Sequence, residues 1–176
     1  MSTALQRPFP GCRPQRTKNP MLDDRFTQGA QSALMLSFSA ARRLGHNFIG
    51  SEHLLLGVFG ERTGAAHRAL SSLGVTEQRL FDAVAASVGS GSGALSSPLM
   101  LTARAARIIE GSVAQATASG AASVASEHIL MSILVERDCG GVRVLLACGV
   151  DCAQLYNILI ARQSTASAPP RAPGAT

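Results

Sequence analysis

The chain has 176 residues and a formal net charge of +5. Without its two ends, about 140 residues remain, which is enough for one compact domain and excludes a multidomain enzyme. The excess charge lies at those ends, because residues 23–163 hold 11 basic and 11 acidic side chains. A nucleic-acid-binding face needs clustered positive charge, so no nucleic-acid partner is expected. No apolar run reaches the roughly 18 residues that a membrane span requires, so no membrane partner is expected either.

Residues 1–22 carry four basic side chains and no acidic one, and prolines interrupt them. They are predicted to be a disordered basic extension outside the fold, without the apolar centre of a secretory signal. An arginine-bearing, acid-free start is also typical of organelle transit peptides. The expected location is therefore cytoplasmic, with a plastid as the alternative if this extension is a transit peptide.

The first predicted helix follows this extension. Apolar residues recur from Ala30 to Leu44 at spacings of three and four, which places them on one face of a helix. Thr27 is the expected N-cap and Gly45 the expected stop.

Three shorter helices complete the first half of the chain. The second begins after Gly50, with Ser51 as its expected cap, and the third runs from Gly64 to Leu73. Thr76 is the expected cap of the fourth.

The second half of the chain repeats this plan. A shift of 75 residues aligns 26–88 with 101–163 without a gap and makes 17 of 63 positions identical. Thr102, Ser126 and Asp151 are the expected caps of the second copy. Self-similarity over a whole supersecondary unit indicates a duplication.

The predicted fold is all-α, with two tandem four-helix repeats, about eight helices, packed as one pseudo-twofold domain over residues 23–163. Repeat 1 covers about 25–89 and repeat 2 about 99–163, with a flexible Gly/Ser-rich linker at 90–98. Residues 164–176 are rich in proline, alanine and serine and are predicted to be a disordered tail. No alternating run of β-branched residues predicts a strand.

Both copies carry a Ser-Glu-His motif before an apolar triplet, at residues 51–53 and 126–128. Glutamate in a first turn is favoured by the helix dipole, and histidines beside apolar triplets are most often core residues. The order Glu-His does not match the His-Glu-x-x-His of a zinc protease. The four cysteines form no C-x-x-C pair, and Cys148 is expected to be a buried thiol. No metal, cofactor or catalytic residue is predicted, so the chain is not expected to be an enzyme.

Several runs of the first copy together point to a known family. Arg25-Phe26-Thr27, then RLGHN at 43–47, then IGSEHLLLG at 49–57, then LGV at 73–75 resemble the N-terminal repeat domain of Clp ATPases, in particular that of ClpC. The resemblance covers residues 25–163 with ungapped spacing. It implies an all-α double repeat that is mounted on AAA+ unfoldase rings and receives substrates and adaptor proteins without performing chemistry.

The resemblance also implies a ligand. Some ClpC-type domains bind phosphorylated arginine as a degradation mark, with one site per repeat. They use the Thr that opens the first helix and the Glu of the motif, which match Thr27 and Glu52 in the first copy and Thr102 and Glu127 in the second. A phosphoryl group suits the N–H groups of a helix start beside a hydroxyl, and a guanidinium requires a carboxylate. Helix capping alone also explains each residue.

The second copy departs from the family pattern. It lacks the counterparts of His46 and Gly50, and the Gly-Glu-Gly that follows the second helix in the family is replaced by Cys139-Gly140-Gly141. The first copy has Thr63-Gly64-Ala65 there. These changes weaken the expectation of a second ligand site and of adaptor surfaces.

The only lysine is Lys18, and no Gly-x-x-x-x-Gly-Lys motif surrounds it, so a P-loop ATPase is excluded for this sequence. The leading hypothesis is a non-catalytic substrate- or adaptor-binding module of Clp protein quality control. Its expected partners are a Clp-type AAA+ ATPase or the Clp protease core, with adaptors or client polypeptides. The alternatives are an accessory assembly subunit that binds the Clp protease core or ring, as in plastids, or the N-terminal fragment of a ClpC-type unfoldase.

Overall fold

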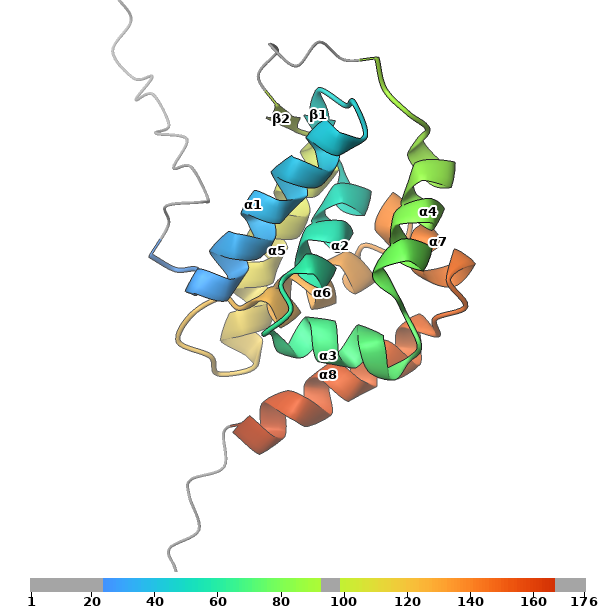
Figure 1. Cartoon of the computed structure of the whole chain (residues 1–176). Helices are drawn as coiled ribbons and strands as arrows, with labels where there is room; N and C mark the ends of the chain where they lie inside the picture. Colours follow the sequence, from blue (N-terminus) through green and yellow to red (C-terminus); the bar gives the residue numbers. More distant parts are fainter. Residues whose placement is uncertain (1–23, 93–98, 167–176) are drawn as a thin grey trace, which may run out of the picture.

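The computed structural model describes residues 24–92 and 99–166, with side chains to residue 163. The predicted N-terminal extension and most of the predicted linker and tail lie outside these residues. The described part contains eight helices and two short strands (Figure 1). They are α1 (Gln28–Arg43), β1 (Phe48–Ile49), α2 (Ser51–Gly60), α3 (Ala65–Ser72), α4 (Glu77–Val88), β2 (Met100–Leu101), α5 (Ala103–Ala118), α6 (Ser126–Val135), α7 (Gly140–Ala147) and α8 (Cys152–Ala166).

The all-α class and the four-plus-four helix plan are confirmed, with two corrections. The two strands were not predicted, because each has only two residues and no alternating pattern. The predicted tail was placed three residues too early, since α8 continues to Ala166. Four helices start where the sequence predicts. Thr27, Thr76 and Thr102 each accept a hydrogen bond from the third residue of their helix, and Asp151 accepts two at the start of α8.

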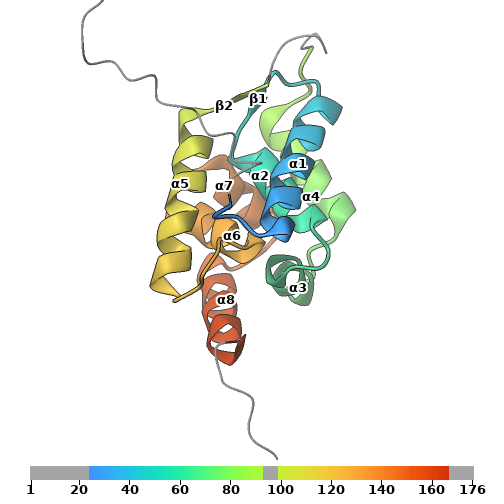
Figure 2. The ribbon, with the colours of Figure 1, turned by 90° about the vertical axis from the view of Figure 1, so that its left-hand side faces the viewer.

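The core lies around α2 and α6. These two helices are apolar on almost every side, and both are buried over most of their length, which is the pattern of a helix at the centre of a domain. They contact each other, and each also contacts the first helix of both repeats. Figure 2 shows α6 between α5 and α1. The two repeats therefore share one hydrophobic core.

Backbone pairing crosses between the repeats at two equivalent places. Strands β1 and β2 pair in parallel, with Ile49 opposite Leu101, and an isolated parallel bridge joins Phe26 to Val124. A shift of 75 residues converts one pairing into the other. In each case the segment before the first helix of one repeat pairs with the segment before the second helix of the other.

No single helix in the described ranges is long and apolar enough to cross a bilayer. The pair α7 and α8 reaches that length and composition only jointly, and the two helices are bent by 102°.

Candidate functional site

The crossed pairing brings helix starts from both repeats together. The Thr27 N–H donates to Val124 O at 2.8 Å, and α6 starts two residues after Val124 with Ser126 and Glu127. The start of α3 joins them, because Glu61, close before it, lies against Gly29 of α1 and accepts from Ser126 Oγ at 3.0 Å. We call this convergence of the starts of α1, α3 and α6 the Thr27 junction.

The equivalent convergence of α2, α5 and α7 is the Thr102 junction. The Thr102 N–H donates to Ile49 O at 3.0 Å, two residues before Ser51 starts α2. The Gly141 N–H in the first turn of α7 donates to Ser51 Oγ at 3.1 Å. Arg104 in the first turn of α5 donates to Asp138 O at 3.0 Å, next to the start of α7.

This geometry corrects the expected pairing of the site residues. Helices α1 and α2 form an antiparallel pair, in which Glu61 after the end of α2 lies against Gly29 in the first turn of α1. Thr27 therefore lies near the end of α2 and Glu52 at its start, about the 15 Å length of a 10-residue helix away. Thr27 instead shares a junction with Glu127, and Thr102 shares one with Glu52. Each candidate site therefore combines the threonine of one repeat with the glutamate of the other.

The motif histidines, and not the serines, hydrogen-bond at the starts of α2 and α6. The N-cap residues are Gly50 and Ala125, and the serines are the first helical residues. The Gly50 N–H donates to His53 Nδ1 at 3.0 Å, and the Ala125 N–H donates to His128 Nδ1 at 2.9 Å. The prediction of serine caps was therefore wrong, because each helix starts one residue earlier than predicted. The imidazole three residues after the N-cap accepts from the N-cap N–H, as the third helical residue does in a capping box.

The prediction that these histidines are core residues is confirmed. His53 is fully buried, and since its Nδ1 accepts, its Nε2–H donates to His46 Nδ1 at 2.9 Å. Burial, reinforced by the charge of His46 and opposed by that of Glu52, lowers the pKa of His53 to about 4. In the second repeat His128 instead contacts Ser119 Oγ at 3.1 Å, and burial lowers its pKa as well. Both imidazoles are neutral at pH 7.

At the Thr27 junction, Glu61 is the buried acidic group, with only 6% of its surface exposed. Its carboxylate accepts from Ser126 Oγ at 3.0 Å, from the Thr63 N–H at 3.1 Å and from the Thr63 hydroxyl. Glu61 was not predicted from the sequence as a site residue. Its signals are an acidic residue shortly before Gly64, at the start of α3, and the identity with Glu136 in the other copy. Within the described residues, the carboxylate of Glu127 accepts no hydrogen bond and forms no salt bridge.

At the Thr102 junction the acids are arranged differently. The carboxylate of Glu52 lies against Gly140 at the start of α7 and accepts from Ser51 Oγ at 3.0 Å. Glu136, the counterpart of Glu61, instead forms salt bridges with Arg107 at 2.7 Å and Arg104 at 3.6 Å. The hydrogen bond from Arg107 lowers the pKa of the Glu136 carboxyl.

Among the described residues, no three histidine, cysteine, aspartate or glutamate side chains are grouped as metal ligands. Cys139, Cys148 and Cys152 are free thiols. Cys148 is 4% exposed, which confirms the predicted buried thiol, and burial raises its pKa.

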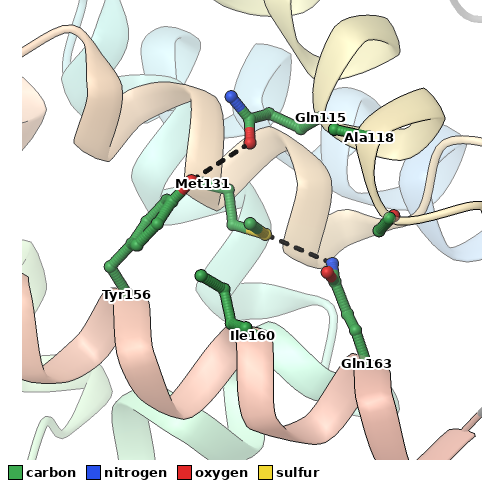
Figure 3. A pocket seen from close by; sticks show the side chains of 7 residues that line it. Gln115, Ala118, Met131, Tyr156, Ile160 and Gln163 are labelled. Carbon is green, nitrogen blue, oxygen red and sulfur yellow. Dashed lines mark hydrogen bonds between the residues drawn. The ribbon is translucent and has the colours of Figure 1, made fainter.

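Two grooves lie away from the junctions, on the face of α8. One, of about 410 Å³, lies between α5, α6 and α8 and is lined by Met131, Tyr156 and Ile160, with Gln115 and Gln163 (Figure 3). The other, of about 530 Å³, lies between α6, α7 and α8 and shares Tyr156. Val135, Leu146 and Ile160 on these grooves are 56%, 58% and 43% exposed.

The equivalent groove of the first repeat is lined by charged side chains, Arg43, Glu77 and Asp82. It has a volume of about 440 Å³ and is lined by α1, α2 and α4. Arg43 lies over the ring of Phe81 there, 4.7 Å from its centroid. The counterparts of Val135, Leu146 and Ile160 are Gly60, Ser71 and Ala85. The exposed apolar face is therefore that of the second repeat, and an exposed apolar patch is typical of an interaction surface.

Comparison with known proteins places this architecture. Residues 25–148 match the model of the Clp repeat (R) N-terminal domain. The chain is 38% identical over 137 residues to an ATP-dependent Clp protease ATP-binding subunit ClpA homolog of Trieres chinensis, covering 78% of this chain and 16% of that protein. It is 40% identical over 128 residues to chloroplastic ClpC1 of Arabidopsis thaliana, covering 73% of this chain and 14% of that protein. The chain thus spans about one sixth of the length of these relatives.

Solved structures share the fold. The N-terminal domain of ClpD from Arabidopsis thaliana matches with a TM-score of 0.69 and 22% identity, over 81% of this chain and 97% of that one. A ClpV N-domain in complex with a VipB peptide matches with a TM-score of 0.63 and 17% identity, over 85% and 96%. From the matched residues, the two repeats and these relatives, the chain belongs to the Clp repeat (R) N-terminal domain family.

Proposed function

We propose that this chain is a non-catalytic module that receives client polypeptides or adaptor proteins for a Clp-type ATPase. The observation that carries the proposal is the pair of junctions, where three helix starts, a threonine hydroxyl and a glutamate of the other repeat converge. The match to a short part of ATP-binding Clp subunits supports it.

The ligand class proposed for the junctions is phosphoarginine, free or in a marked client. Thr27 with Glu127 and Thr102 with Glu52 are the two candidate sets of binding residues. A phosphoryl group is stabilised by the N–H groups and the positive dipole end of a helix start. The guanidinium of the same ligand forms charge-assisted hydrogen bonds with a carboxylate. Both halves are available where the start of α1 or α5 meets the glutamate of the other repeat.

Adaptors or unfolded segments are proposed to dock on the apolar face between α5, α6, α7 and α8. The ClpV N-domain of similar fold forms a complex with a VipB peptide, and a peptide partner is proposed for this chain by analogy. The exposed Val135, Leu146 and Ile160 offer the apolar contacts that such a segment requires.

Several curated relatives are chloroplast proteins, which supports the plastid alternative over the cytoplasmic expectation. In that setting the assembly role also gains support, with the Clp protease core or ring as the partner. Affinity purification of the tagged full chain separates the two roles. Recovery of Clp core subunits without client polypeptides favours assembly, and recovery of clients or adaptors favours reception.

Isothermal titration calorimetry with free phosphoarginine tests the ligand. Saturable heat with phosphoarginine, and none with arginine or with inorganic phosphate at the same concentration, is the expected result, because each of those carries only half of the recognised chemistry. Thr27→Val and Thr102→Val together should weaken the binding at least tenfold. No saturable heat from a folded protein, checked by circular dichroism, removes phosphoarginine as the ligand.

A further inference from the structure

Resting on the proposed function, we propose that the two junctions are inequivalent and that the chain binds one phosphoarginine, at the Thr27 junction. Glu127 receives the guanidinium there, whereas Glu52 is held as a structural cap on α7. Gly140 is the positioning residue that decides this difference.

The carboxylate of Glu52 lies on the first residue of α7, Gly140. Its Oε1 lies where a side chain on Gly140 would be, so that a Cβ at this position would overlap the carboxylate. Ser51 Oγ donates to the same carboxylate at 3.0 Å and is itself held by the Gly141 N–H at 3.1 Å. The charge of Glu52 therefore lies on the positive end of α7, where it is stabilised.

The first repeat has a side chain at the position of Gly140. The residue equivalent to Gly140 is Ala65, the first residue of α3. Its Cβ fills the space that Glu52 uses on α7, so Glu127 cannot fold onto α3 in the same way. In agreement, Glu127 has no hydrogen-bond partner within the part of the chain that the structure describes.

One residue earlier the exchange is reversed, with glycine in the first repeat and a side chain in the second. A Cβ on Gly64 would overlap Glu61 Oε2, which means that Glu61 occupies the space of a missing side chain. The equivalent of Gly64 is Cys139, which carries a side chain there and is fully buried. Glu136 accordingly does not fold back over Cys139 and instead pairs with Arg104 and Arg107 at the junction.

Each junction thus holds one carboxylate against a helix start, that of Glu61 beside α3 and that of Glu52 on α7. The repulsion of this charge on an incoming phosphoryl group is common to both and does not separate them. The difference is the remaining acid. The Thr27 junction keeps Glu127 for a guanidinium, whereas the second acid of the Thr102 junction, Glu136, is already paired with Arg104 and Arg107.

Calorimetry of the full chain with free phosphoarginine tests the inequivalence. The unmodified protein should bind one equivalent. Glu127→Gln should weaken binding at least tenfold, while the matched Glu52→Gln should change the affinity less than twofold and lower the melting temperature. Two equivalents of similar affinity, or binding that is lost in Glu52→Gln and kept in Glu127→Gln, would overturn the inequivalence while leaving the proposed function standing.

Gly140→Ala tests the positioning residue. A methyl group should push the Glu52 carboxylate off α7, free it, and add a second equivalent of binding. The double variant Gly140→Ala/Glu52→Gln should return to one equivalent, and a stoichiometry of one in the single variant contradicts the role of Gly140. If any variant fails to fold, amide NMR of the unmodified protein decides instead. Phosphoarginine should shift the Gln28 and Gly29 amides, and shifts confined to Ala103 and Arg104 would refute the assignment. Absence of heat and of shifts throughout would instead remove phosphoarginine as the ligand of the proposed function.

Discussion

The starts of α3 and α7 have the same position in their repeats and are covered by different acids. Glu61 covers α3 from the end of α2, and Glu52 covers α7 from the first turn of α2. Both acids are identical between the copies, so sequence identity does not predict which of them is used. The choice follows from the neighbouring glycine, at 64 in one repeat and at 140 in the other. A functional residue carried over by position alone can therefore have a different partner in each copy.

The largest loss of stability is expected from a substitution of Gly57, because the two repeats differ most in packing at this position. A Cβ there would overlap Ala33 O and Ser37 Oγ of α1, and overpacking against backbone costs about 3 kcal/mol. Gly57→Ala should lower the free energy of unfolding by that amount in urea denaturation. The counterpart is Ser132, and Ser132→Ala should cost less than about 1 kcal/mol. Similar losses in both variants would mean that the helix pairs α1–α2 and α5–α6 are packed equally closely.

The histidines should give the next largest difference, as a dependence on pH. The pKa of His53 is lowered to about 4 by burial and His46, so the unfolded chain binds a proton between pH 6.5 and 4 that the folded chain does not. Stability is therefore complete above pH 6.5 and falls as the pH drops toward 4, by on the order of 2 kcal/mol. Urea denaturation at pH 7.5 and 4.5 measures this loss.

The comparison is made between His53→Gln and His128→Gln. Each removes one titrating imidazole, and other groups contribute equally to both. The loss between pH 7.5 and 4.5 should shrink in both variants, and more in His53→Gln, because His128 has no second imidazole beside it. An unchanged loss in His53→Gln would show that this residue is already protonated in the folded state.

Glu61 and Glu136 should differ in what they contribute to stability. Glu61→Ala leaves Ser126 Oγ and the Thr63 N–H without an acceptor, and buried polar groups left unpaired cost about 1 to 2 kcal/mol. Glu136→Ala breaks surface salt bridges with Arg104 and Arg107, which contribute less than about 1 kcal/mol. Chemical denaturation at pH 7 measures both losses, with and without 0.5 M salt, about the ionic strength that screens surface ion pairs. Salt should reduce the loss of stability in Glu136→Ala and leave the loss in Glu61→Ala unchanged. Equal losses would contradict the different burial of the two acids.

Arg43 should give the smallest effect. Its guanidinium lies over the Phe81 ring of the first repeat, and an exposed cation–π contact contributes about 0.5 to 1 kcal/mol. Arg43→Gln should lower the melting temperature slightly, whereas the counterpart Ala118→Gln on an exposed position should leave it unchanged. A larger effect of the second substitution would show that the groove of Figure 3 is sensitive to added bulk.

Much of the fold follows from local signals in the sequence. Thr27, Thr76, Thr102 and Asp151 cap their helices as predicted, because a short oxygen-bearing side chain before a helix has few other uses. Gly45, Gly74, Gly120 and Gly149 all have φ between +71° and +78°, the left-handed conformation that ends a helix. The duplication predicts that whatever holds for one copy holds for the other, and this is correct for these residues.

The rest depends on contacts between the copies. The crossed pairing at Ile49 and Leu101 uses backbone groups only, which carry no side-chain signal, and it decided which threonine meets which glutamate. The start of α2 was misassigned to a serine cap. The N-cap is Gly50, and the side chain that bonds to its N–H comes from His53, three residues further along. The roles of Glu61 and Glu52 require knowing where a missing Cβ leaves space in the other repeat, which a single sequence does not state.

The crossed pairing of the two repeats also bears on their origin. One repeat alone exposes the backbone of its two extended segments and could complete a junction only with a second copy, as in a twofold homodimer. In such a dimer every substitution would appear twice, and the two junctions would remain identical. Joining the halves into one polypeptide removes that constraint, so each half can change by itself while still depending on the other to fold.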